Sequence, residues 1–115
     1  MFETAKYYVG KLFTENVPGT CSGALACAWA VNFIEAIATG NVIGGGLSTT
    51  RLYAALLAGR GTPIDHQSGE PGYVIISPTA GDRIGHAGIL DGDGEIYSNS
   101  SSGAAWRQNY SIVTW

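Results

Sequence analysis

The chain has 115 residues, of which 45% are hydrophobic and 13% charged, with a net charge of −3. This length and composition suit one folded domain, residues 1–115, and exclude a disordered chain. Because the charge is negative and no basic run occurs, nucleic acid is not an expected partner. The longest apolar run, residues 24–31, is far shorter than the roughly 20 residues that cross a bilayer. We therefore expect no membrane span, and we expect a monomer.

Helical periodicity dominates the first half of the chain. Apolar residues at three- and four-residue intervals predict an amphipathic helix over 2–14. A second helix is expected from residue 23 or 24 to 39, ended by Gly40. It is apolar on two sides, which is typical of a buried central helix. A third helix is expected over 49–58, with Ser48 as its N-cap and Gly59 as its stop.

Strand patterns dominate the second half. The expected strands are 73–77, 86–90, 95–100 and 110–115. An Asp-Gly pair follows the second strand, and such a pair between two strand-like runs strongly indicates a hairpin. Helices followed by an antiparallel sheet predict an α+β fold.

Cys27 is the principal candidate for a nucleophile. It is expected in the first turns of the buried helix, where exposed backbone amides and the helix dipole stabilise a thiolate. Such a thiolate attacks carbonyl carbons, as in acyl-transfer enzymes. The structural alternative is a small buried side chain among alanines.

His86 is the candidate general base, because an imidazole accepts a thiol proton near neutral pH. A hairpin centred on Gly92 and Asp93 would pair His86 with Asn99, whereas a bulged turn would bring Ser98 onto its face. Either side chain can orient the imidazole, and Asn99 is preferred. The catalytic set predicted from the sequence is thus Cys27, His86 and Asn99.

Other polar and aromatic residues carry weaker signals. Trp29 and Tyr97 are candidates for lining a substrate groove together with Ser98, although aromatic residues in so small a protein are more often core. The two cysteines and two histidines lack zinc-site spacing, so no metal is expected, and His66 is expected to be solvated. A disulfide between Cys21 and Cys27 is disfavoured, because the intervening helix would have to bend back on itself.

Three segments together resemble a known family. Residues 25–32 are similar to the nucleophile helix of CHAP-type cell-wall cysteine peptidases. Residues 71–76 and 85–89 resemble the first two strands of NlpC-type and CHAP-type domains, with Tyr73 where those domains usually have aspartate. The closing stretch from Ser98 through Trp106 and Trp115 is similar to small phage-associated members.

The resemblance implies a papain-like fold, with N-terminal helices packed on a C-terminal antiparallel sheet. It also implies hydrolysis of amide bonds in peptidoglycan, without a cofactor. Cys21 is a rival nucleophile, because Cys-Ser-Gly opens the helix in NlpC-type domains. The distance to the helix-ending glycine favours Cys27, since Cys27 lies 13 residues before Gly40 and Cys21 lies 19.

The start of the chain bears on how the protein reaches its substrate. The N-terminus lacks the basic start and apolar block of a secretory signal. We therefore expect synthesis in the cytoplasm, with action on the cell wall or in the periplasm after lysis or specialised export. The alternatives to a hydrolase are a catalytically inactive wall-binding module of the same fold and a Cys-His acyltransferase.

Overall fold

The computed structural model describes residues 2–23, 25–60, 70–77, 85–91, 93–100 and 102–111. Its helical elements are α1 (Phe2–Tyr7), α2 (Cys27–Thr39), α3 (Thr49–Ala55) and the π-helical turn η1 (Leu56–Arg60). Its strands are β1 (Val74–Ser77), β2 (His86–Leu90), β3 (Glu95–Ser100) and β4 (Ala105–Ser111). None of the helices in the described segments is both long and apolar enough to cross a membrane.

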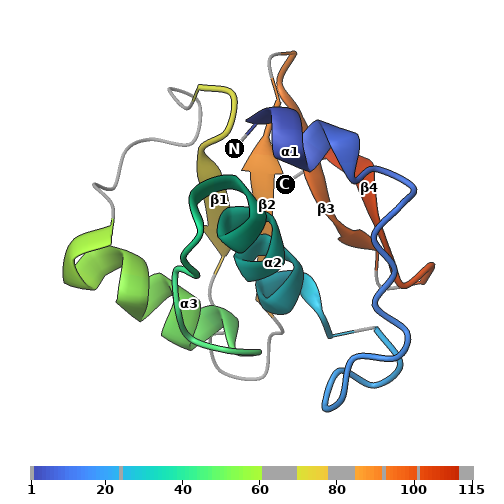
Figure 1. The fold of residues 1–115 in the computed structure, drawn as a ribbon, viewed down its shortest axis with the longest axis horizontal. Coiled ribbons are helices and arrows are strands. Elements are labelled where there is room, and N and C mark those ends of the chain that lie inside the picture. Colours follow the sequence, from blue (N-terminus) through green and yellow to red (C-terminus); the bar gives the residue numbers. More distant parts are fainter. Residues whose placement is uncertain are drawn as a thin grey trace.

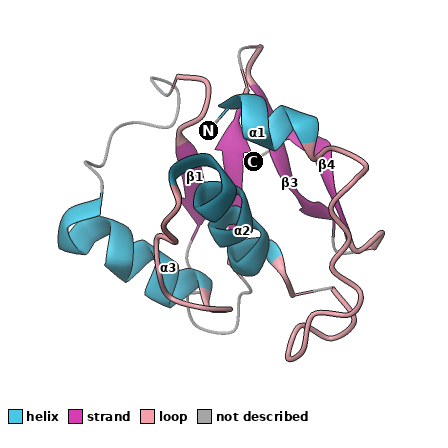
Figure 2. Cartoon of the chain, in the orientation of Figure 1, coloured by secondary structure: helices cyan, strands magenta, loops and turns pink. Residues whose placement is uncertain are grey.

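The four strands form one antiparallel sheet in the order β1-β2-β3-β4. Figure 1 shows α2 crossing one face of this sheet, with α1 near one end of the strands and α3 beside β1. Figure 2 shows the same division into a helical first half and a stranded second half. The prediction of an α+β fold is confirmed.

The two faces of the sheet carry separate apolar clusters. On the α2 face, Ala87 and Ile89 of β2 belong to one cluster with Val31 and Ile34 of α2. The other face carries a smaller cluster of Ile75, Leu90 and Ile96. Because successive strand residues point to opposite faces, the side chain of His86 leaves β2 on the face opposite α2.

The first helix is shorter than predicted, since α1 ends at Tyr7 and not near residue 14. Gly10 adopts a φ of 73°, which favours glycine and ends the helical path. The N–H of Gly10 then donates to the Trp106 carbonyl at 3.0 Å, and the N–H of Trp106 donates to the Leu12 carbonyl at 2.9 Å. Pairing with β4 therefore replaces the second half of the expected helix.

The central helix begins at Cys27, later than residue 23 or 24. Cys21, Ser22 and Gly23 have φ values of 51°, 58° and 91°, and a right-handed helix cannot include such residues. The predicted end is confirmed. Gly40 has a φ of 85°, and its N–H donates to the Ala36 carbonyl.

Two further boundaries differ from the sequence prediction. Ser48 is the N-cap of α3, as predicted, and its hydroxyl accepts from the Arg51 N–H at 3.1 Å. Gly59 does not stop the helix, because the chain continues as the π-helical turn η1. The last strand begins at Ala105 and not at residue 110, because it pairs with β3 from Ser100 onward. Residues 112–115, and the loop containing His66, lie outside the described residues.

The hairpin between β2 and β3 has the bulged register. Leu90 pairs with Ile96 and Gly88 with Ser98. Asp91 and Glu95 close the turn, and Gly94 adopts a left-handed φ of 76°. This turn has one residue more than the two-residue loop that would pair His86 with Asn99, so that pairing is wrong and the alternative holds. Ser98 therefore lies on the face of His86, and Asn99 lies on the α2 face.

Gly88 fits between β2 and β3 only without a side chain. A Cβ atom there would lie 2.7 Å from both Ile96 Cγ2 and the Tyr97 carbonyl oxygen. We expect Gly88→Ala to lower the free energy of unfolding by about 1–3 kcal/mol, because the strands must move apart. Urea unfolding measures this. Gly103→Ala is the control, since its Cβ would meet the movable Arg107 and Ser100 side chains at 3.3 Å. Equal losses in both variants would contradict the tight packing at Gly88.

Candidate active site

The sulfur of Cys27 lies where α2 meets the start of β2. Cys27 is the first residue of α2, and its side chain is only 8% exposed. Its thiol is 4.0 Å from the carbonyl oxygen of Gly85. Backbone N–H groups of Cys27, Ala28 and Ala87 also interact with the sulfur. The expected position at the start of a buried helix is thus confirmed, and the strand contributes an amide from the other side.

Burial and the backbone amides act on the Cys27 thiol in opposite directions. Burial raises the pKa of Cys27 above the ordinary value of a thiol, while the N–H groups of Ala87, Ala28 and Cys27 lower it by less. The net result is a raised pKa, because the buried sulfur loses more solvation than three N–H dipoles return. The resting form of Cys27 at neutral pH is therefore the thiol.

His86 is the first residue of β2 and pairs with Ser77 of β1. Its imidazole is half-buried and lies edge-on to the ring of Tyr110, with 5.3 Å between ring centroids. Burial lowers the pKa of His86 below its ordinary value, because a buried imidazolium loses hydration. At neutral pH the imidazole is therefore neutral and able to accept a proton.

The sulfur of Cys27 lies beside the backbone that flanks His86 and not beside the imidazole. The sulfur contacts Gly85 and Ala87, the two neighbours of His86 in the sequence. Among the described residues, the thiol and the imidazole form no hydrogen bond with each other. The sequence thus predicted the neighbourhood of the two residues, and the imidazole would have to turn around the edge of β2 to reach the sulfur.

Asn99 does not lie beside His86 in this structure. Its side chain is 1% exposed and lies on the α2 face. The Asn99 amide Nδ2 donates to the Gly23 carbonyl at 2.7 Å, and its Oδ1 accepts from the Thr14 hydroxyl at 2.7 Å. These contacts tie β3 to the segment that leads into α2. Asn99 thus supports the start of α2, and the described residues show no contact through which it would orient the imidazole.

The residues predicted to line a substrate groove differ in exposure. Ser98 is fully buried, and its hydroxyl hydrogen-bonds to Asn109 Oδ1. Tyr97 is 5% exposed and belongs to the apolar core on the α2 face. Trp29 is partly exposed, and its ring stacks on Phe33 with 5.5 Å between centroids. Of the three, only Trp29 offers surface to a ligand.

Neither cysteine forms a disulfide, since Cys21 and Cys27 are both free thiols. Cys21 is exposed and lies in the turn before α2, away from the helix start that a nucleophile would use. In the part of the chain that the structure describes, no three His, Cys, Asp or Glu side chains come together as a metal site would require.

Sequence reasoning missed the buried amide of Asn32. This residue is 7% exposed and lies one turn and a half after Cys27 on α2. Its Oδ1 accepts from the N–H groups of Ile43 and Gly44 at 2.8 and 2.9 Å, and its Nδ2 donates to the Gly44 carbonyl at 2.9 Å. An amide within the apolar first half of α2 was the signal in the sequence, because buried amides need partners.

Comparisons with protein-family models, curated proteins and solved structures found no match for this chain. The candidate site therefore rests on its own geometry and on the resemblance of the sequence segments.

The lowered pKa of His86 makes stability depend on pH. Above its ordinary value of about 6.5, His86 is neutral in both the folded and the unfolded chain. As pH falls below that value, the unfolded chain binds a proton that the folded chain resists. We expect the free energy of unfolding to decrease by up to about 1.4 kcal/mol per pH unit until the folded pKa is passed.

Urea unfolding between pH 7.5 and 5 measures this dependence in the wild type and in His86→Gln. The His86→Gln variant is expected to lose this part of the slope. His66→Gln, which removes the only other histidine, is the control and is expected to retain it. A slope that survives in His86→Gln would show that other groups cause it.

The Asn99 contacts predict a second change in stability. Asn99→Ala leaves the buried Gly23 carbonyl and Thr14 hydroxyl without their partner, which we expect to cost about 2–4 kcal/mol of unfolding free energy. Thr14→Val removes only one of the two hydrogen bonds and is expected to cost less. Chemical unfolding of both variants tests this. An Asn99→Ala variant as stable as the wild type would show that the two Asn99 hydrogen bonds do not stabilise the fold.

Proposed function

We propose that this chain is a cysteine hydrolase that cleaves amide bonds in peptidoglycan, with Cys27 as nucleophile and His86 as general base. The observation that carries the proposal is the position of the sulfur. It lies at the first residue of a buried helix, among three backbone amides and between the two neighbours of a histidine. The sequence segments similar to NlpC-type and CHAP-type peptidases support the papain-like fold and the substrate class.

The reaction follows from the protonation states of the two groups. His86 takes the proton of the Cys27 thiol as the sulfur attacks the amide carbonyl, and a carbon–sulfur bond forms. The N–H groups beside the sulfur stabilise the negative charge of the intermediate. The imidazolium of His86 gives its proton to the leaving nitrogen as the carbon–nitrogen bond breaks. Water then hydrolyses the thioester and restores the thiol.

The proposed reaction requires His86 to move, because its imidazole packs against Tyr110 and not against the Cys27 sulfur. The pairing of β2 with β3 runs from Gly88 to Leu90, so His86 precedes the part of β2 that β3 covers. In the proposed reaction the imidazole moves away from Tyr110 and toward the sulfur, which contacts Gly85 and Ala87. In this proposal, substrate binding accompanies that movement. Apo geometry of catalytic pairs is often looser than that of the substrate complex.

Two observations favour a second function, that of a catalytically inactive wall-binding module of the same fold. The thiol has a raised pKa, and among the described residues no hydrogen bond joins the thiol and the imidazole. For such a module, purified sacculi would bind the wild-type protein and release no soluble fragments.

The nucleophile assignment is tested by release of fragments from purified sacculi, with mass spectrometry of the products to identify the bond. We expect Cys27→Ala to lose activity by a factor on the order of 10³ or more, as removal of a nucleophile does. His86→Ala is expected to lose a comparable factor. Cys21→Ala is the matched control, because it removes the exposed thiol and leaves Cys27 in place.

The possible results separate the assignments. Loss in Cys21→Ala with full activity in Cys27→Ala would transfer the role to Cys21. Full activity in both variants would exclude a cysteine nucleophile. Circular dichroism of each variant establishes that the comparison is between folded proteins.

A further inference from the structure

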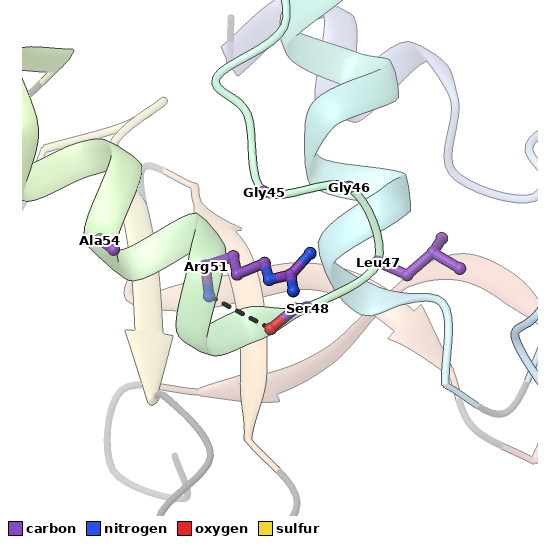
Figure 3. A pocket seen from close by; sticks show the side chains of 6 residues that line it. All are labelled: Gly45, Gly46, Leu47, Ser48, Arg51 and Ala54. Atoms are coloured by element: carbon purple, nitrogen blue, oxygen red, sulfur yellow. Dashed lines mark hydrogen bonds between the residues drawn. The ribbon is translucent and has the colours of Figure 1, made fainter.

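The loop between α2 and α3 borders an open hollow of about 760 Å³. Its lining consists of Gly45, Gly46, Leu47, Ser48, Arg51 and Ala54. Figure 3 shows the Arg51 side chain extending from α3 across this hollow toward the loop. Among the described residues that line the hollow, Arg51 alone is charged, and none of them is a carboxylate that would neutralise its guanidinium.

The loop that forms one wall is fixed to the nucleophile's helix. The buried Asn32 side chain, on α2, makes three hydrogen bonds to the backbone of Ile43 and Gly44. Leu47 reaches the segment that leads into α2, because a Cβ atom on Gly19 would lie 2.9 Å from Leu47 Cδ1. In Figure 1 the loop runs back along α2 toward the end of the helix where Cys27 lies. The loop that lines the hollow is thus attached to α2, the helix that carries the candidate nucleophile.

Three consecutive glycines precede Leu47 in this loop, and two of them, Gly45 and Gly46, line the hollow. Gly44, Gly45 and Gly46 have φ values of 126°, 83° and 58°, a region that favours glycine. A Cβ atom on Gly45 would lie 2.4 Å from the Leu52 N atom, so the loop backbone packs directly against α3. A Cβ atom on Gly46 would meet no atom within 4 Å. A ligand can therefore approach the backbone at Gly46 closely.

The chemistry of the lining selects an acidic ligand with small apolar groups. A guanidinium binds a carboxylate through two parallel hydrogen bonds. Leu47 and Ala54 offer apolar surface for groups the size of a methyl. We propose that this hollow binds a free carboxylate of the peptide substrate, and that the guanidinium of Arg51 forms an ion pair with it. This inference rests on the proposed function, because it assigns the hollow to the peptide that Cys27 cleaves.

The test compares a stem tetrapeptide that ends in alanine, as the free acid and as the form with every carboxyl group amidated. For the free acid, we expect Arg51→Gln to raise KM roughly tenfold to a hundredfold, the loss expected for a charged hydrogen-bonded pair, with kcat nearly unchanged. For the amidated peptide the variant and the wild type are expected to be equal. Arg51→Lys is expected to lie between them, because it keeps the charge and loses the paired donors.

Arg107→Gln is the matched control, since Arg107 is an exposed arginine on β4, at the edge of the sheet opposite β1 and α3. It makes the same change of charge and is expected to leave both peptides unaffected. A loss of equal size in Arg107→Gln would assign the effect to net charge and overturn the proposal.

Binding separates this inference from the proposed function. Titration calorimetry with Cys27→Ala and with the double variant Cys27→Ala, Arg51→Gln measures affinity for the two peptides without cleavage. Preference for the free acid in the first protein, and its loss in the second, supports the carboxylate site even if the wild type cleaves nothing. Equal affinity of Cys27→Ala for the two peptides, or no binding of either, would overturn the site whether or not sacculi are hydrolysed.

Discussion

The position of the candidate nucleophile depends on one buried side chain, the amide of Asn99. Its two hydrogen bonds, each 2.7 Å, join β3 to Thr14 and to the carbonyl of Gly23. The approach at Gly23 is close, because a Cβ atom there would lie 2.6 Å from the Ala104 side chain. A buried hydrogen bond of this kind is directional and costly to break. It therefore fixes where the chain turns into α2, and with it the sulfur of Cys27.

That placement determines the electrostatics of the site. Backbone amides at the helix start stabilise the thiolate of Cys27, but burial against β2 destabilises it more, so the pKa of the thiol is raised. Burial has the corresponding effect on His86 and disfavours its imidazolium. In the free protein Cys27 is a thiol and His86 is a neutral imidazole, so the two do not form a thiolate–imidazolium ion pair. In the proposed reaction, proton transfer accompanies attack on the carbonyl, where the amides beside the sulfur stabilise the new charge.

Local signals in the sequence predicted most of the elements. The glycine that ends α2, the serine that caps α3 and the two strands of the central hairpin lie where short-range rules place them. The errors arise from contacts between distant parts of the chain. The first helix is cut short by pairing of residues 10–12 with Trp106, and β4 begins early because it pairs with β3. Periodicity within a window cannot reveal such partners.

The site was predicted unevenly for the same reason. The place of Cys27 at a helix start follows from local pattern, and so does the place of His86 at a strand start. The partner of His86 depended on hairpin register, and one extra turn residue exchanged the faces of Ser98 and Asn99.

Two buried asparagines have the same role, one for the segment before α2 and one for the segment after it. Asn99 satisfies the backbone carbonyl of Gly23 just before the helix, and Asn32 satisfies the backbone of Ile43 and Gly44 after it. Both segments are irregular, and buried backbone groups outside helices and strands need side-chain partners. Regular structure would leave no glycine-lined hollow beside the helix and no sharp turn before Cys27. The two amides thus hold irregular backbone rigidly next to the candidate nucleophile, and a rigid surrounding is what a site needs to keep its reacting groups in place.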